Sequence, residues 1–260
     1  MAQVIAIANQ KGGVGKTTTA VNLAASLAVL KKRVLLVDMD SQGNATMGSG
    51  VQKNDLLHSV TDVLLGEMPI ETAIAKAEVG YKVLGANRDL AGVELAIAEQ
   101  DGREFILRDA LQQVKENFDF IIVDCAPSLS LITVNALTAV DAVIIPMQCE
   151  YYALEGLADL TQTIDRIQQA LNPNLHIMGV LRTMYDARNA LTRDVSAELE
   201  QYFGSKLYET VIPRNIRLAE APAHGLPVIY FEKSSKGAVA YLNLAAEVIK
   251  KNKVKKGQVA

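Results

Sequence analysis

The chain has 260 residues, half of them hydrophobic, with no tryptophan and a formal net charge of −3. This length fits one large α/β domain with a sizeable core, and two cysteines exclude a disulfide framework. The net charge excludes a general polycation, so nucleic-acid binding would need a local basic patch. The N-terminus lacks the pattern of a signal peptide and no apolar run reaches the length of a membrane span, so a cytoplasmic protein is expected.

Short apolar runs alternate with longer amphipathic segments along the chain, which predicts a mostly parallel, doubly wound α/β sheet with helices on both faces. The predicted strands are Val4–Ala8, Val34–Val37, Phe120–Val123, Val143–Pro146 and Ile177–Leu181, with weaker candidates at Tyr81–Leu84 and Leu207–Thr210. The predicted helices are at about Thr17–Leu30, Arg103–Asn117, Leu154–Leu171, Thr192–Phe203 and Gly237–Lys251.

A glycine-rich segment joins the first predicted strand to the first predicted helix. Its glycines let successive backbone N–H groups point at one spot, and the helix adds its positive N-terminal end there. Lys16 is expected to face the β- and γ-phosphates of a nucleotide, and the Thr17 hydroxyl is expected to bind magnesium. The order of strand, glycine turn, Gly-Lys-Thr and helix predicts a single P-loop NTPase domain. The segment reads Asn9-Gln10-Lys11-Gly12-Gly13-Val14-Gly15-Lys16-Thr17-Thr18.

Acidic residues follow two of the predicted strands. Asp38 and Asp40 lie at the end of the second strand, and Asp124 follows four apolar residues. Because ligands bind at the carboxyl ends of strands in such a sheet, we expect these side chains near the P-loop. Asp124 is predicted to serve magnesium through water, and Asp40 to bind magnesium and to position the attacking water. A polar turn after the strand is the alternative for the Asp38–Asp40 pair.

The glycine-rich segment departs from the general P-loop pattern, because Gln10 stands where that pattern has glycine and Lys11 precedes the paired glycines. The segment resembles the deviant Walker A motif of the ParA/MinD ATPases. Ser41 and Ala126 stand where proline is usual in that family, which changes backbone stiffness and removes no reacting group. Asp38–Gly43 and Asp124–Leu129 resemble the corresponding motifs of the ParA family. Three further segments resemble the chromosomal ParA branch, often called Soj, so that the match spans nearly all of residues 2–250: Met147–Gly156, Thr183–Arg188 and Val211–Pro222.

The resemblance implies a slow, ATP-dependent DNA-segregation ATPase that serves chromosome or plasmid partitioning. MgATP is expected to close a sandwich homodimer in which Lys11 reaches the nucleotide of the facing subunit. This dimer is expected to bind double-stranded DNA without sequence preference, and a ParB-type centromere-binding protein is expected to trigger hydrolysis and release. The expected location is the nucleoid, within the cytoplasm.

The candidate site residues fall into four groups. Lys11, Lys16 and Asp40 are the predicted catalytic residues. Magnesium is assigned to Thr17, Asp40 and Asp124. As the resemblance implies, Arg188 and Arg217 contribute to DNA binding; five of the ten arginines lie in residues 182–217, but five acids share that span. The predicted ATP-binding residues are Lys11, Gly12, Gly13, Val14, Gly15, Lys16, Thr17 and Thr18, with Pro213, Arg214 and Asn215 near the adenine by resemblance.

A MinD-like membrane-cycling ATPase that positions cell division or a cargo is the alternative function. It requires an amphipathic C-terminal anchor. Here an apolar helical stripe is interpreted as core, and a lysine-rich segment follows, so no stable membrane association is expected. The predicted organisation is an ATPase domain at residues 1–250 and a flexible tail at residues 251–260. The stripe consists of Val239, Leu242, Ala245, Ala246 and Ile249.

Two further functions are less favoured by the sequence. Iron–sulfur ligation would need spaced cysteine pairs, and neither Cys125 nor Cys149 belongs to one. A metabolic kinase would need a second substrate pocket, for which the sequence gives no sign.

Overall fold

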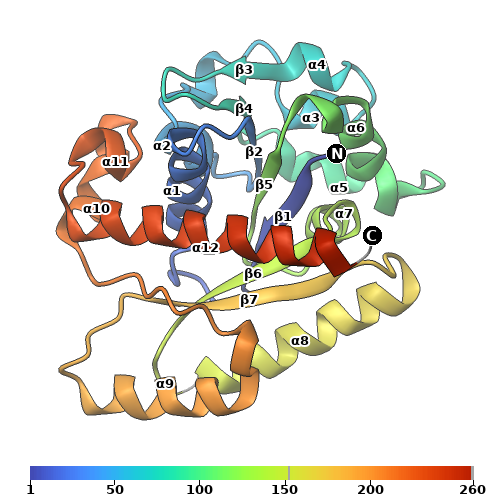
Figure 1. The fold of residues 1–260 in the computed structure, drawn as a ribbon. Helices are drawn as coiled ribbons and strands as arrows, with labels where there is room; N and C mark the ends of the chain where they lie inside the picture. Colours follow the sequence, from blue (N-terminus) through green and yellow to red (C-terminus); the bar gives the residue numbers. More distant parts are fainter. Residues whose placement is uncertain (152, 259–260) are drawn as a thin grey trace.

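The computed structural model describes residues 1–151 and 153–258, and a seven-stranded sheet crosses this part of the chain (Figure 1). The strand order is β3-β4-β2-β5-β1-β6-β7, and every neighbouring pair is parallel except β3 with β4. This arrangement confirms the predicted mostly parallel α/β sheet. The strands are β1 (Gln3–Ile7), β2 (Val34–Met39), β3 (Ile74–Lys76), β4 (Lys82–Leu84), β5 (Phe120–Cys125), β6 (Ala142–Gln148) and β7 (His176–Thr183).

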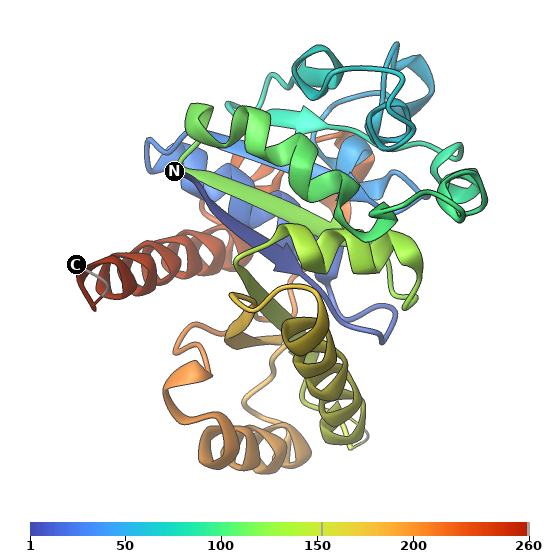
Figure 2. The ribbon, with the colours of Figure 1, turned by 90° about the vertical axis from the view of Figure 1, so that its right-hand side faces the viewer.

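Helices cover both faces of the sheet (Figure 1, Figure 2). The side chains of β1 alternate between two cores: Val4 and Ala6 pack on the side of α6 and α7, whereas Ile5 and Ile7 pack on the side of α1 and α12. Both faces are therefore buried, which explains why the strands read as continuous apolar runs. The helices are α1 (Lys16–Val29), α2 (Asn44–Gly48), α3 (Val60–Leu64), α4 (Ile70–Ala73), α5 (Leu90–Ile97), α6 (Ile106–Val114), α7 (Leu131–Ala139), α8 (Ala153–Ala170), α9 (Ala190–Phe203), α10 (Ile216–Glu220), α11 (Val228–Phe231) and α12 (Lys236–Gln258).

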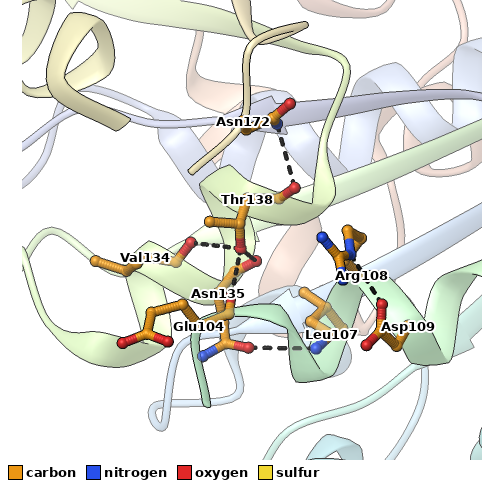
Figure 3. A network of polar contacts seen from close by, with 8 residues as sticks. All are labelled: Glu104, Leu107, Arg108, Asp109, Val134, Asn135, Thr138 and Asn172. Carbon is orange, nitrogen blue, oxygen red and sulfur yellow. Dashed lines mark hydrogen bonds and ion pairs between the residues drawn. The ribbon is translucent and has the colours of Figure 1, made fainter. Parts of the chain in front are cut away.

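The side-chain amides of Asn135 and Asn172 link α6, α7 and the segment after α8 by hydrogen bonds to backbone groups (Figure 3). Asn135 of α7 accepts a hydrogen bond from the Leu107 N–H of α6 at 3.2 Å and donates to the Arg103 carbonyl at 2.7 Å. The Asn172 amide donates to the carbonyls of Thr138 and Val140 at 3.2 and 2.8 Å. These bonds satisfy backbone groups at helix ends, where intrahelical partners are missing.

The weaker strand prediction at Tyr81–Leu84 is confirmed by β4, whereas the one at Leu207–Thr210 is wrong. Leu207 forms only an isolated bridge to Val180 of β7. Side chains form hydrogen bonds with backbone groups that would pair with a neighbouring strand in a regular sheet. The Arg182 guanidinium donates to the Tyr208 carbonyl at 2.8 Å, and the Glu247 carboxylate accepts from the Thr210 N–H at 3.2 Å.

Helix α12 differs from the prediction in its length and its buried stripe. It continues to Gln258 instead of ending at Lys251, because lysine favours helices and no glycine or proline occurs between Lys251 and residue 257. Its buried hydrophobic residues are Ala238, Ala240, Tyr241, Leu244, Ala245 and Val248. Of the predicted stripe, Ala245 is buried, Leu242 and Ile249 are half-buried, and Val239 and Ala246 are exposed. Residues 259–260 of the predicted tail lie outside the described residues.

Several short elements escaped prediction. Helix α7 is apolar around most of its surface and lacks the amphipathic periodicity that marks a surface helix. Helices α2, α4, α10 and α11 have four or five residues each, which is too short for a periodic signal. No described helix is long and apolar enough to span a membrane.

Candidate nucleotide-binding site

The P-loop connects β1 to α1 at the carboxyl edge of the sheet. Gly13 and Gly15 adopt φ of +75° and +89°, a conformation that glycine reaches without strain. The Asn9 amide donates to the Pro146 carbonyl of β6 at 2.8 Å, and the Thr183 hydroxyl of β7 donates to the Val14 carbonyl at 2.8 Å. The loop is thus fixed to two strands, and the N-terminus of α1, which has no side-chain cap, opens into it.

The two lysines of the loop occupy different environments. Lys16 is buried, and its Nζ donates to the Lys11 carbonyl at 3.0 Å, across the loop. Burial lowers the pKa of Lys16, while the charges of Asp124 and Asp40 oppose that change. Lys11 is about half exposed and its Nζ lies 2.7 Å from Glu150 Oε2, which follows β6. This ion pair could not be predicted from the sequence, because the two residues are far apart in the chain.

Two buried carboxylates lie side by side at the carboxyl edge. Asp38 of β2 is in register with Asp124 of β5, which is in turn in register with Ile7 of β1. Burial raises the pKa of Asp38 to about 6, and burial together with the charge of Asp38 raises the pKa of Asp124 well above its ordinary value. Neither oxygen of Asp124 has a hydrogen-bond partner among the described residues, although the Thr17 hydroxyl is near enough to lower its pKa.

The orphaned Asp124 carboxylate and the Thr17 hydroxyl fit a magnesium ion. Magnesium is commonly held by one or two protein oxygens together with water and nucleotide phosphates. The described residues contain no cluster of three or more histidine, cysteine, aspartate or glutamate side chains able to hold a metal by themselves. Both cysteines are free and buried. The donor set therefore suits Mg²⁺ bound with a nucleotide.

Asp40 lies on the loop that follows β2 and is half-buried. Its Oδ1 accepts from the Gln42 N–H at 2.9 Å, and its own N–H donates to Asp38 Oδ1 at 3.2 Å. Asp40 is close enough to Lys16 and Asp124 to shift the pKa of each. The fold thus gathers the four residues that were predicted from three separate segments: Lys16, Thr17, Asp40 and Asp124.

A cavity of about 200 Å³ lies beside the start of α1. Pro213, Arg214 and Asn215 line it together with Gly15 and Thr18 of the phosphate loop, which places these predicted base-contacting residues next to the loop. The cavity is also lined by residues that were not predicted from the sequence. Met184 adopts a strained φ of +48°, and the Tyr241 hydroxyl of α12 hydrogen-bonds with Thr19 Oγ1 at 3.1 Å. The additional lining residues are Thr183, Met184, Ile212, Leu218, Ala219 and Tyr241.

The two arginines predicted to contact DNA are exposed and ion-paired. Arg188 lies 2.8 Å from Asp186 in the β7–α9 connection, and Arg217 of α10 lies 2.7 Å from Glu220. Arg182, which also belongs to the arginine-rich span, instead turns inward and donates to Ser196 at 2.7 Å. Folding therefore removes one of the five arginines from any surface patch.

Comparison with known proteins gives the family. A family model described as an AAA domain matches residues 2–177. The chromosome partitioning protein ParA of Myxococcus xanthus is 49% identical over 96% of this chain and 89% of its own length. The sporulation initiation inhibitor protein Soj of Bacillus subtilis is 53% identical over 95% of this chain and 98% of its own length. The chain belongs to the ParA/Soj family of P-loop ATPases.

Solved structures of ParA/Soj-like fold agree with this assignment. A Mycobacterium smegmatis structure named cobyrinic acid a,c-diamide synthase, with bound ATP analog and magnesium, has a TM-score of 0.86 and 38% identity and covers 97% of this chain and 96% of that chain. The cell division ATPase MinD of Pyrococcus furiosus has a TM-score of 0.80 and 27% identity, covering 96% and 99%. The ParA/Soj chain is therefore an ATPase with the single P-loop α/β fold that the sequence predicted.

Proposed function

We propose that this ParA/Soj ATPase is a slow, MgATP-dependent switch for DNA segregation that works as a nucleotide-bridged homodimer. The observation that carries this proposal is that the two lysines of the P-loop lie in different environments. Lys16 is buried inside the loop, whereas Lys11 leaves it on the exposed side. The relatives named as chromosome partitioning proteins in Myxococcus xanthus and Caulobacter vibrioides support the cellular role.

The nucleotide is proposed to lie along the loop from the cavity beside α1 to the buried carboxylates. Backbone N–H groups of residues 12–18 would hold the phosphates, and Lys16 would neutralise their charge. Thr17 and Asp124 would hold magnesium, which supplies further positive charge when it is bound. The base would enter the cavity lined by residues 213–215, between the P-loop and α12.

Hydrolysis requires mainly positioning and charge compensation. We assign Asp40 to orient the attacking water, since it is the half-buried carboxylate next to two fully buried ones. Lys16, held by the Lys11 carbonyl, would stabilise the charge that builds up on the phosphate oxygens. Such a site stays slow until a partner completes it, which is the proposed role of a ParB-type protein.

Lys11 is proposed to act on the nucleotide of the facing subunit. In the single chain its ammonium contacts Glu150, and both side chains are about half exposed. An exposed ion pair contributes at most about 1 kcal/mol, so exchanging Glu150 for phosphate oxygens costs little. Dimerisation would then require the nucleotide, because the nucleotide supplies the oxygens that Lys11 contacts.

The test of this proposal is light scattering with MgATP on an Asp40→Ala background. Adding Lys11→Ala should leave ATP binding intact and abolish the dimer. Lys76→Ala, a change of an exposed lysine on the edge strand β3, serves as the matched control and should leave the dimer intact. A stable ATP-bound dimer without Lys11 would show that this lysine acts within its own subunit.

DNA is preferred over a membrane as the surface to which the dimer binds. The buried face of α12 is occupied by the core, and the side chains of Arg188 and Arg217 are exposed. Gel shifts with unrelated DNA duplexes and pelleting with anionic liposomes, each with MgATP, separate the two. ATP-dependent pelleting without a gel shift would favour the MinD-like alternative.

The activity in the name of the Mycobacterium smegmatis structures is not adopted for this chain. Those structures are 38–39% identical, whereas relatives named as partitioning proteins or Soj are 43–53% identical over nearly the whole chain. Whether the cargo is a chromosome or a plasmid is decided by the centromere that the partner binds.

A further inference from the structure

A single hydroxyl joins three segments behind the nucleotide site. Thr46, in α2, donates from Oγ1 to Asp38 Oδ2 at 2.7 Å, and its N–H donates to the same oxygen at 2.9 Å. The Thr46 hydroxyl oxygen also accepts from the Ala86 N–H, after β4, at 2.9 Å. Asp38 and Thr46 are both fully buried, so these bonds are shielded from competing water.

The loop that carries Asp40 is thereby fastened at both ends to one carboxylate. At its start, the Asp40 N–H donates to Asp38 Oδ1 at 3.2 Å, and at its end Thr46 binds Asp38 Oδ2. Between these points, Gly43 has a φ of +62°, and a Cβ there would come within 2.6 Å of the Ala86 carbonyl. The loop is therefore held closely against the segment after β4.

We propose that Asp38 and Thr46 are positioning residues that hold the Asp40 carboxylate in place for hydrolysis. Both Asp38 oxygens are engaged by donors on this loop, so Asp38 acts through the loop and not on the nucleotide. The Thr46 hydroxyl supplies the cross-link, because it is donor to Asp38 and acceptor from Ala86 at once. This inference rests on the proposed role of Asp40 and adds two residues to it.

The test compares two buried hydroxyls, that of Thr46 in the middle of α2 and that of Ser49 at its C-cap. Thr46→Val keeps the shape and removes both hydroxyl bonds, whereas Thr46→Ser keeps the hydroxyl. Ser49→Ala, the matched control, removes the hydroxyl that donates to the Ala45 carbonyl at 2.7 Å and accepts from Tyr81 at 2.7 Å, without touching Asp38. Nucleotide affinity, KM, kcat and unfolding free energy are measured for each.

Thr46→Val should lower kcat about 10- to 100-fold with little change in nucleotide affinity, as expected for a misplaced carboxylate. It should also accumulate the ATP-bound state, as is expected of Asp40→Ala, and Thr46→Ser should restore turnover. Ser49→Ala should lose stability and keep its kcat.

Equal kcat losses in Thr46→Val and Ser49→Ala, or failure of Thr46→Ser to restore turnover, would reduce Thr46 to a structural role and overturn the inference. Normal turnover in Asp40→Ala would instead overturn the proposed function itself. The two failures are therefore distinguishable, because one concerns only the Thr46 variants and the other concerns Asp40.

Discussion

At the scale of single residues, two acidic side chains are buried next to each other where the ligand is proposed to bind. Asp38 and Asp124 are adjacent, fully buried carboxylates, and Asp124 lacks hydrogen-bond partners within the described chain. An unsatisfied buried polar group costs about 1–3 kcal/mol, and a charged one costs more. Functional sites accept such a cost because the ligand later supplies the missing partner.

Substitutions of Lys16 and Asp40 should affect different steps, ATP binding and ATP hydrolysis respectively. Lys16→Ala should abolish ATP binding, because the loop loses the buried charge that faces the phosphates. Asp40→Ala should bind ATP and fail to hydrolyse it, since only the carboxylate that is proposed to orient the water is lost. Fluorescent nucleotide titration and phosphate release measure the two steps, and ordinary turnover in Asp40→Ala would contradict the assignment.

Asp124→Asn should raise the stability of the nucleotide-free protein by about 1 kcal/mol or more near pH 8, because it removes a buried unpaired charge. The pKa of this acid is raised in the folded state, so the native protein binds its proton more tightly than the unfolded chain does. Wild-type stability should therefore increase as pH falls from above the folded pKa toward the unfolded value, near 4.

Denaturant unfolding without nucleotide at a series of pH values measures this difference between wild type and Asp124→Asn. MgATP should stabilise the wild type more than the variant, since the carboxylate that is proposed to hold magnesium is gone. A variant that is no more stable than the wild type, and equally stabilised by MgATP, would remove Asp124 from the magnesium site.

At the scale of elements, the lack of a side chain at Gly179 allows the segment after α9 to pack directly against β7. The segment after α9 passes so close that a Cβ on Gly179 would lie 2.5 Å from the Tyr208 ring and 2.7 Å from the Lys206 carbonyl. That segment continues into residues 212–215 of the base cavity. Close approach here thus positions one wall of the proposed nucleotide site.

Gly179→Ala should destabilise the protein by about 1–3 kcal/mol, because the backbone and a buried ring have to move apart. Gly92→Ala, in the exposed part of α5 with nothing within 4 Å of its Cβ, should instead stabilise by about 0.5–1 kcal/mol. Thermal unfolding of both variants measures the contrast. Equally small changes in stability at the two positions would show that residues 204–208 can move away from β7 at little energetic cost.

At the scale of the whole molecule, the proposed DNA binding has to overcome a net charge of −3. The exposed arginines Arg188 and Arg217 each pair with an acid, which reduces the positive field they offer. Phosphate contacts release counterions, so affinity for DNA should fall steeply with salt and vary little with sequence.

Arg188→Ala with Arg217→Ala should weaken MgATP-dependent binding equally on unrelated duplexes and leave basal ATPase activity unchanged in the absence of DNA. Asp186→Asn with Glu220→Gln should strengthen binding, because each frees an arginine from its acidic partner. Fluorescence anisotropy across a salt series measures both. Full affinity in the arginine variant would move the patch elsewhere, for example to the lysines of α12.

The sequence by itself determined the features that consecutive residues encode. Strand β1, the glycine turn and α1 form one continuous stretch, and Asp124 directly follows an apolar strand, so local pattern was enough to predict the P-loop and both carboxylate positions. The parallel sheet followed from the alternation of strands and helices, because parallel strands need helical crossovers.

Only the tertiary structure decided the features that depend on residues far apart in the chain. It paired Lys11 with Glu150, tied Thr46 to Ala86, and built the base cavity from segments near residues 15, 183, 213 and 241. It also replaced the predicted strand at Leu207–Thr210 by bonds to side chains of β7 and α12. The periodicity of hydrophobic residues indicates that an element has a buried face. It does not indicate which distant segment packs against that face, because this depends on the tertiary structure.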